Sequence, residues 1–342
     1  MDALDFFDQV YAVSQDAIKV PQAVTYTFLV ATLTIRVVFC NQRLADQMTP
    51  ALRHLVIKDN PAAAFTIYAW DSESTQTAMP DAVWSADAIQ VQGRIDGFDN
   101  ERIQAAFLPL TDGFAIVDFK RNIGLHRVQN AQTISIHQRS YPFRTLISWW
   151  AMRRNLVFAH GAAVGLEDAG VLIAGPSGSG KSTSALACLG SDLLYVSDDH
   201  VLLSDQPYAH GLYQSAKLRR EQFDRFPTLR AHIVPDQPPD DKALLFLDEI
   251  APGQVTSGLP IRAFLVPRVT GERDTSIHQT SCAKVMMSLA PSSLFLIPVE
   301  QQVAFRKLAE MVRKVPSFEI RLGTDLDQIP EQIHSFITGT LL

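Results

Sequence analysis

The feature that most constrains the fold of this chain is the stretch Gly175–Ser182, GPSGSGKS, which fits the pattern G-x-x-x-x-G-K-[S/T] in full. The apolar run Val171–Ala174 leads into it, and a helix is expected over Lys181–Leu189. A strand, a glycine-rich loop and a helix in this order create a nest of backbone N–H groups that binds anionic oxygens. The sequence therefore predicts a phosphate-binding loop within a layered α/β domain.

Each residue type in this loop has a physical role. Glycines allow the tight curl of the backbone, Lys181 reaches the β- and γ-phosphates, and the Ser182 hydroxyl ligates Mg²⁺. ATP and Mg²⁺ are the expected ligands, and the chain lacks the Asn-Lys-x-Asp motif that selects guanine. The residues predicted to bind phosphate are Gly175, Ser177, Gly178, Ser179, Gly180, Lys181, Ser182 and Thr183.

Two adjacent aspartates, Asp198 and Asp199, end the next apolar run, Leu193–Ser197. We expect this strand to lie directly beside the strand that precedes the loop, which brings both carboxylates near the γ-phosphate. One carboxylate, assigned to Asp198 together with Ser182, holds Mg²⁺, and the other accepts a proton from an attacking hydroxyl. The sequence leaves open which of the two is the base, and a pair that merely caps the following turn is the alternative.

Other polar residues are weaker candidates for the same site. His160 ends the run Val157–His160, where it would contact the phosphoryl group or tune an aspartate, unless its role is structural. Four basic residues are candidates for stabilising transferred charge, each with a surface role as the alternative. They are Lys217, Arg219, Lys242 and Arg262.

The stretch His160–Asp199 resembles the core of the HPr kinase/phosphorylase family, in which a His-containing strand, a hairpin, a P-loop and an Asp-Asp pair follow in this order. The resemblance implies the fold that this family shares with phosphoenolpyruvate carboxykinases, with ATP and Mg²⁺ bound at the P-loop. It also implies that one aspartate acts as acid/base for a protein serine. The residues that inherit roles at the transferred phosphate are His160, Lys181, Ser182, Asp198 and Asp199.

Outside this stretch the chain departs from that family, because it lacks the glycine-rich substrate-capture segment after the Asp pair and its N-terminal half looks different. The overall plan is more similar to HPr-kinase-like proteins of peptide-modification clusters, including lasso peptide kinases, which act on a serine hydroxyl of a peptide. This similarity includes Ser215–Pro227, Ile261–Val269 and Phe318–Ile329. We therefore expect a kinase whose acceptor is a peptide or protein serine.

Three alternatives remain open at this point. Asp248-Glu249, after the apolar run Leu244–Leu247, matches the strand and acidic pair of hydrolytic ATPases, in which Glu polarises water. Phosphorylation of a small-molecule alcohol and nucleotide-dependent binding without catalysis are the other two.

With 342 residues the chain is long enough for two domains. We expect an accessory α+β domain for recognition or assembly over residues 1–140 and a kinase domain over 141–342. A short opening helix should precede the accessory strands, and a helix over Phe143–Arg154 should open the kinase domain. The accessory strands are expected over Tyr26–Phe39, Ala64–Trp70, Ile89–Ile95, Arg102–Leu108, Phe114–Phe119 and Thr133–His137.

The composition of the chain limits the classes of partner and the cellular location that we expect. A net charge of −6 gives no overall attraction to nucleic acid or to an anionic membrane. The apolar stretch Ala23–Cys40 alternates with polar residues, which is typical of strands and not of a membrane span. Three scattered cysteines and an acidic first segment without a signal-peptide pattern fit a cytoplasmic protein. Homo-oligomerisation is left open.

Overall fold

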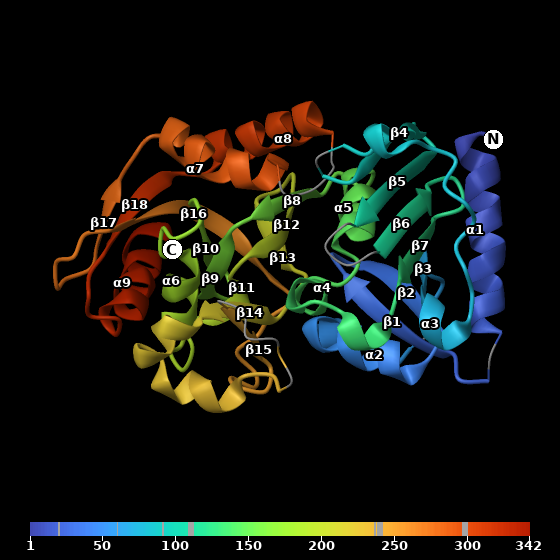
Figure 1. The fold of residues 1–342 in the computed structure, drawn as a ribbon. Coiled ribbons are helices and arrows are strands. Elements are labelled where there is room, and N and C mark those ends of the chain that lie inside the picture. The colour runs from blue at the N-terminus through green and yellow to red at the C-terminus, as the bar shows by residue number, and fades with distance from the viewer. Residues whose placement is uncertain are drawn as a thin grey trace. The chain divides into compact units, whose positions relative to one another are not determined.

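The computed structural model describes residues 1–19, 21–59, 61–90, 92–108, 113–235, 237, 242–295 and 300–342. The chain is mixed α/β and forms two compact units, Met1–Trp150 and Ala151–Leu342 (Figure 1). The division falls after Trp150 and not at residue 140. The helix expected at the start of the kinase domain, α5 (Arg144–Met152), therefore lies mostly in the first unit.

The first unit is built on one seven-stranded sheet in the order β1-β2-β3-β7-β6-β5-β4. Its strands are β1 (Val24–Val30), β2 (Leu33–Phe39), β3 (Phe65–Asp71), β4 (Arg94–Asp99), β5 (Ile103–Leu108), β6 (Gly113–Asp118) and β7 (Ile123–Val128). Its other helices are α1 (Ala3–Ile18), α2 (Gln42–Met48), α3 (Ser72–Thr75), α4 (Ile136–Ser140), η1 (Pro50–Leu55), η2 (Ala86–Ala88) and η4 (Ala131–Thr133). The expected opening helix is thus present as α1, which packs on β3, β5, β6 and β7 through buried Phe6, Phe7 and Val10.

Three strand predictions in this unit were wrong. The run Tyr26–Phe39 is two strands, because Ala31 and Thr32 adopt positive φ values of 48° and 70° and turn the chain back. Ile89–Ile95 contains only the start of β4, and Thr133–His137 lies in η4 and α4, where the Ser135 side chain caps the helix. Strand β7 was not predicted from the sequence. Two turns that the sequence predicts between strands, Asp59-Asn60-Pro61 and Asp112-Gly113, include residues outside the described ranges.

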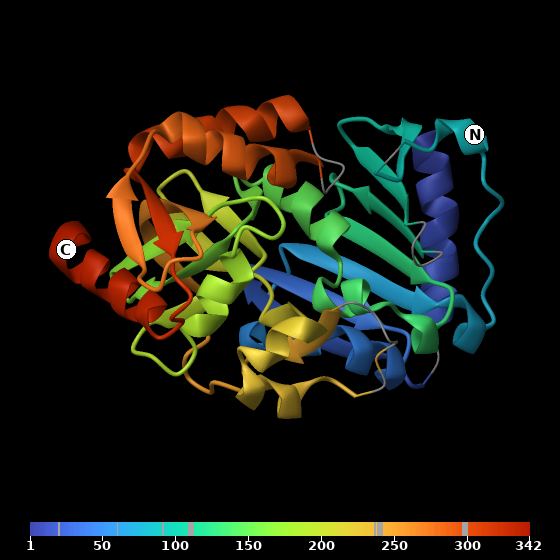
Figure 2. The same ribbon diagram turned by 60° about the vertical axis from the view of Figure 1, so that its left-hand side comes forward.

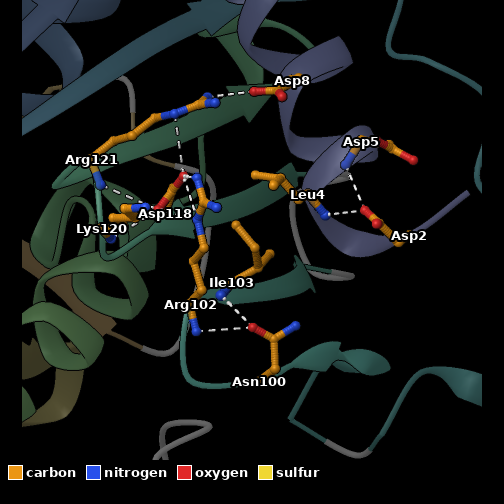
Figure 3. Close-up of polar contacts among 10 residues, drawn as sticks. All are labelled: Asp2, Leu4, Asp5, Asp8, Asn100, Arg102, Ile103, Asp118, Lys120 and Arg121. Atoms are coloured by element: carbon orange, nitrogen blue, oxygen red, sulfur yellow. Dashed lines mark hydrogen bonds and ion pairs between the residues drawn. The ribbon is translucent and has the colours of Figure 1, made fainter.

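A buried carboxylate joins the loops at one end of this sheet (Figure 3). Asp118, whose side chain has no exposed surface, receives hydrogen bonds from the Arg102 guanidinium at 2.9 Å and from the backbone N–H of Lys120 at 2.8 Å. The Arg121 guanidinium bridges Asp118 to Asp8 on α1. Burial by itself would raise the pKa of Asp118, but these donors outweigh it and hold the pKa below the ordinary value of 3.8.

We therefore expect Asp118 to contribute stability above pH 4 that is lost as the pH falls below 3.8 through the lowered pKa. Asp118→Asn should lower the free energy of unfolding at pH 7 by about 2 kcal/mol, since hydrogen bonds to a charged group are lost. All 4 tryptophans of the chain precede residue 151, so tryptophan fluorescence during denaturation reports on this unit in the intact protein. Equal stability of the variant and the wild type at pH 7 would contradict this role.

The second unit contains a nine-stranded sheet with the path β11-β9-β10-β16-β13-β12-β8, extended by β18 and β17 from β16. Its strands are β8 (Val157–His160), β9 (Ala162–Leu166), β10 (Ala169–Ile173), β11 (Leu194–Ser197), β12 (His200–Ser204), β13 (Tyr208–Gly211), β16 (Gly258–Val269), β17 (Ser276–Gln279) and β18 (Ser317–Leu322). A separate ribbon pairs β14 (Ser215–Arg219) with β15 (Lys242–Phe246). The helices are α6 (Lys181–Ala187), α7 (Cys282–Phe295), α8 (Gln301–Lys314), α9 (Gln328–Phe336), η5 (Arg220–Asp224), η6 (Pro227–His232) and the π-helical η7 (Ile337–Leu341).

Most local predictions for this unit are confirmed. The strands that the sequence predicts over Val157–His160, Gly170–Ala174, Leu193–Ser197, Leu244–Leu247, Arg262–Pro267 and Phe318–Leu322 are present as β8, β10, β11, β15, β16 and β18. The helices predicted over Lys181–Leu189, Val303–Lys314 and Leu326–Thr338 are present as α6, α8 and α9. Strands β9, β12, β13, β14 and β17 and helix α7 were not predicted from the sequence. Helix α7 lies beside α8 in both views (Figures 1 and 2). The Pro- and Asp-rich stretch Pro235–Asp241, whose composition predicts a surface loop, lies mostly outside the described residues.

One prediction about strand order was wrong. β11 does not lie beside β10, because β9 pairs antiparallel with both of them and separates them. The two flanking strands still run in the same direction, so the loop after β10 and the aspartates after β11 meet at the same edge of the sheet. No helix in the described ranges is long and apolar enough to cross a membrane.

Candidate active site

The loop after β10 has the backbone that its glycines predict. Gly178 and Gly180 adopt φ values of 80° and 104°, a left-handed conformation that favours glycine. A Cβ atom at Gly180 would also collide with the Leu322 side chain of β18. Ser177 is exposed on the outer side of the loop, whereas Thr183 is buried in the first turn of α6.

Lys181 lies inside this loop. Its Nζ atom donates hydrogen bonds to the carbonyl oxygens of Gly175 at 2.6 Å and Pro176 at 3.1 Å, and the residue is only 6% exposed. Burial lowers the pKa of Lys181, and the charges of Asp199 and Asp198 oppose that shift. The ammonium group is therefore within electrostatic reach of both aspartates, as the motif and the strand end predict.

Asp198 faces the start of α6 and is 2% exposed. The Ser182 hydroxyl lies close enough to its carboxylate to oppose the rise in pKa, and Oδ1 has no hydrogen-bond partner among the described residues. Burial, reinforced by the charge of Asp199, raises the pKa of Asp198 to about 7. A buried carboxylate oxygen without a partner, beside a serine hydroxyl, is costly unless a cation or a donor joins it.

Asp199 has a different environment, because cationic or ionisable groups surround it. His160 Nε2 contacts one carboxylate oxygen, while His200 Nδ1 and Lys217 Nζ lie 3.7 and 3.9 Å from the other. Burial alone would raise the pKa of Asp199, but His200, His160 and Lys217 hold it well below its usual value. The lowered pKa favours the ionised carboxylate, and because the side chain keeps 20% of its surface exposed, a second molecule can approach it.

His200 is a component of this site that the sequence analysis did not single out. Its ring is opposite His160 in the β8–β12 register, with ring centroids 5.4 Å apart and an interplanar angle of 26°. On its other side it packs against Phe158 at 5.0 Å. Its place directly after the Asp pair was the only sequence signal, and it becomes meaningful only because β8 and β12 pair.

We expect His200 to position Asp199. For a site that transfers phosphoryl groups from ATP, as the sequence predicts, His200→Leu should lower kcat about tenfold and leave the Kd for ATP unchanged, since groups that orient a reactive side chain typically contribute factors of this size. His200→Phe keeps the ring against Phe158 but has no nitrogen facing Asp199, so it should be equally impaired. Steady-state kinetics with calorimetric ATP titration measure both quantities. A wild-type kcat in His200→Phe would reduce the role of His200 to packing.

The β14–β15 ribbon supplies three of the four basic candidates. Lys217 and Arg219 share one face of β14, and Lys242 is directly opposite Arg219. Lys217 reaches Asp199, and the charge of Lys242 contributes to the lowered pKa of Lys181. The Arg219 side chain is 54% exposed at the end of this face.

Arg262 does not belong to the site. Its Nε atom donates to the carbonyl oxygen of Asp168 at 3.4 Å, next to the start of β10. The phosphate-binding loop leaves the opposite end of that strand, so this candidate was wrong.

The rival acidic pair also lies outside the main sheet. Asp248 and Glu249 follow β15, which pairs with β14 in the two-stranded ribbon. The backbone N–H of Asp248 donates to the Gln214 side chain at 2.6 Å. The arrangement expected of a hydrolytic ATPase, an acidic pair on a strand of the sheet that carries the P-loop, is instead formed by Asp198 and Asp199.

Neither the family models nor the curated proteins searched include a match to this chain. Over the described ranges, no group of three or more His, Cys, Asp or Glu side chains is arranged to hold a metal by itself. Mg²⁺ in nucleotide sites commonly uses one or two protein ligands together with phosphate oxygens, so Ser182 and Asp198 are an adequate protein contribution.

Proposed function

We propose that this chain is an ATP-dependent kinase that transfers the γ-phosphoryl group to the serine hydroxyl of a peptide or protein. The observation that carries the proposal is the convergence of four side chains at one sheet edge. Lys181 and Ser182 come from the loop after β10, and Asp198 and Asp199 come from the end of β11. The HPr-kinase-like order of these elements supports the same reaction class, as does the plan shared with peptide serine kinases.

The phosphate end of ATP lies, in this proposal, in the loop Gly175–Gly180. Lys181 exchanges its hydrogen bonds to the loop carbonyls for the β- and γ-phosphate oxygens. Ser182 and Asp198 would hold Mg²⁺, which fits the unpartnered Asp198 Oδ1 beside the serine hydroxyl. When bound, this ion neutralises charge on the phosphates and orients them for in-line transfer.

Asp199 accepts the proton of the acceptor hydroxyl. Its lowered pKa keeps it ionised, which is the form that a base requires, and its partial exposure lets an acceptor approach. A weak base is sufficient because phosphoryl transfer has a loose transition state with little demand for early proton removal. His160 orients the carboxylate, and Lys217 lies where it can stabilise charge on the transferred group.

The direct test is incubation of the protein with γ-labelled ATP, Mg²⁺ and a pool of serine-containing peptides, followed by mass spectrometry. We expect label on peptide serine and little free phosphate when peptide is absent. Rapid phosphate release that is unaffected by peptides would instead favour the hydrolytic alternative, and label on a small alcohol would change the acceptor class.

A further inference from the structure

Further basic residues follow β14 in an exposed segment, beyond the strand face that carries Lys217 and Arg219. We define the arginine surface as the exposed residues Arg219, Arg220, Arg225 and Arg230. Two acidic residues, Glu221 and Asp224, lie within the same segment and approach Arg219 and Arg230. The local excess of positive charge contrasts with the net charge of −6 for the whole chain.

This surface and the proposed nucleotide site share one hydrophobic core. Phe223 of η5 and Leu229 of η6 are buried in the same core cluster as Ala185 and Leu186 of α6, the helix that follows the phosphate-binding loop. The arginines are therefore carried on the framework that also fixes Lys181. A ligand held by them has a defined position relative to the transferred phosphate.

The distance along β14 from Lys217 to Arg219 relates the arginine surface to the position of the acceptor serine. Lys217 contacts Asp199, and Arg219 is two residues further along the same face, about 7 Å away at the usual strand rise. An extended peptide covers the same distance in two residues. When a serine lies at Asp199, the side chains two or more positions away from it come within reach of the arginine surface.

We propose that the arginine surface docks acidic residues of the acceptor, located two or more positions from the phosphorylated serine. This inference rests on the proposed kinase function and specifies its substrate class. Exposed arginines attract carboxylates to this surface, while the net negative charge of the rest of the protein repels them. Such a charge pattern gives selectivity more than raw affinity. Single-stranded RNA fits less well, because Phe223 is buried and Phe226 half-buried, so the segment has no exposed aromatic platform for base stacking.

Binding of labelled serine heptapeptides tests this inference without requiring transfer. Three peptides carry aspartate, alanine or lysine at the positions two and three residues from the central serine. Fluorescence anisotropy is measured with the full chain, Mg²⁺ and a non-hydrolysable ATP analogue. We expect the aspartate peptide to bind about tenfold more tightly than the alanine peptide and the preference to shrink at high salt, since salt screens exposed charges.

Charge-reversal variants test whether the arginine surface causes the preference for the aspartate peptide. Arg219→Glu combined with Arg225→Glu should remove the preference for the aspartate peptide, whereas Arg313→Glu, a control at an exposed position of α8, should retain it. Equal binding of all three peptides, an unchanged preference in the double variant, or stronger binding of a matched oligouridylate would overturn the inference. Efficient transfer to the alanine peptide without charge preference overturns acceptor docking but not the kinase. Selective binding of the aspartate peptide without any phosphoryl transfer would contradict the kinase proposal but would support a binding site for acidic peptides.

Discussion

Lys181→Ala is expected to lower kcat for phosphoryl transfer by about 1,000-fold, a typical loss when one group that stabilises transition-state charge is removed. The Kd for Mg-ATP should rise by about ten- to one-hundredfold, which corresponds to the loss of one charge-assisted hydrogen bond. The Lys181 ammonium lies inside the loop, where it donates hydrogen bonds to the carbonyl oxygens of Gly175 and Pro176. Isothermal titration calorimetry and a transfer assay measure the two effects separately.

Two further variants control for trivial causes. Lys181→Met retains most of the buried aliphatic stem and should show the same loss, which separates charge from packing. Lys307→Ala on α8 removes one positive charge far along the chain and should leave both constants unchanged. Circular dichroism must show an intact fold, since tryptophan fluorescence reports only on the first unit. Wild-type ATP affinity in a folded Lys181→Ala protein would refute the assignment of the loop.

Asp199→Asn is expected to lower kcat by about 1,000-fold, within the range for loss of a general base, while the Kd for ATP changes less than about threefold. The substitution preserves the shape of the side chain but removes the charge that faces His160 and Lys217. Asp198→Asn should differ, because its carboxylate lies beside Ser182 and its loss should weaken Mg-ATP binding as well. Comparing kcat and Kd for the two variants decides which aspartate has which role.

Glu249→Gln is the matched comparison for the hydrolytic alternative. Glu249 follows β15 in the separate ribbon, so the variant should retain kcat within about twofold. If Glu249→Gln abolished turnover and Asp199→Asn did not, the catalytic site would be misplaced and the ATPase interpretation would be correct.

The sequence by itself determined the local parts of the site. The conformation of the phosphate-binding loop could be predicted because the glycines that it requires are contiguous, and Gly178 and Gly180 do adopt positive φ. The strand before the loop, the helix after it and the strand that ends in Asp198-Asp199 were likewise encoded by short apolar runs. Where local signals were weak, as at Ala31-Thr32 or in Thr133–His137, the predictions were wrong.

Only the tertiary structure decided which distant residues join the site. The insertion of β9 between β10 and β11 and the pairing of His200 with His160 depend on hydrogen bonding between strands, whereas the approach of Lys217 to Asp199 depends on where the β14–β15 ribbon packs. Strand pairing also places Arg262 beside Asp168, at the end of β10 opposite the phosphate-binding loop. It places Asp248-Glu249 after a strand of the separate ribbon. Chain spacing fixes the geometry of neighbours within a loop or helix, but it does not fix the order of strands, since one sequence separation is compatible with several pairings. The loop predicted to bind phosphate is therefore specified by consecutive residues, whereas the groups around Asp198 and Asp199 come together only in the folded domain.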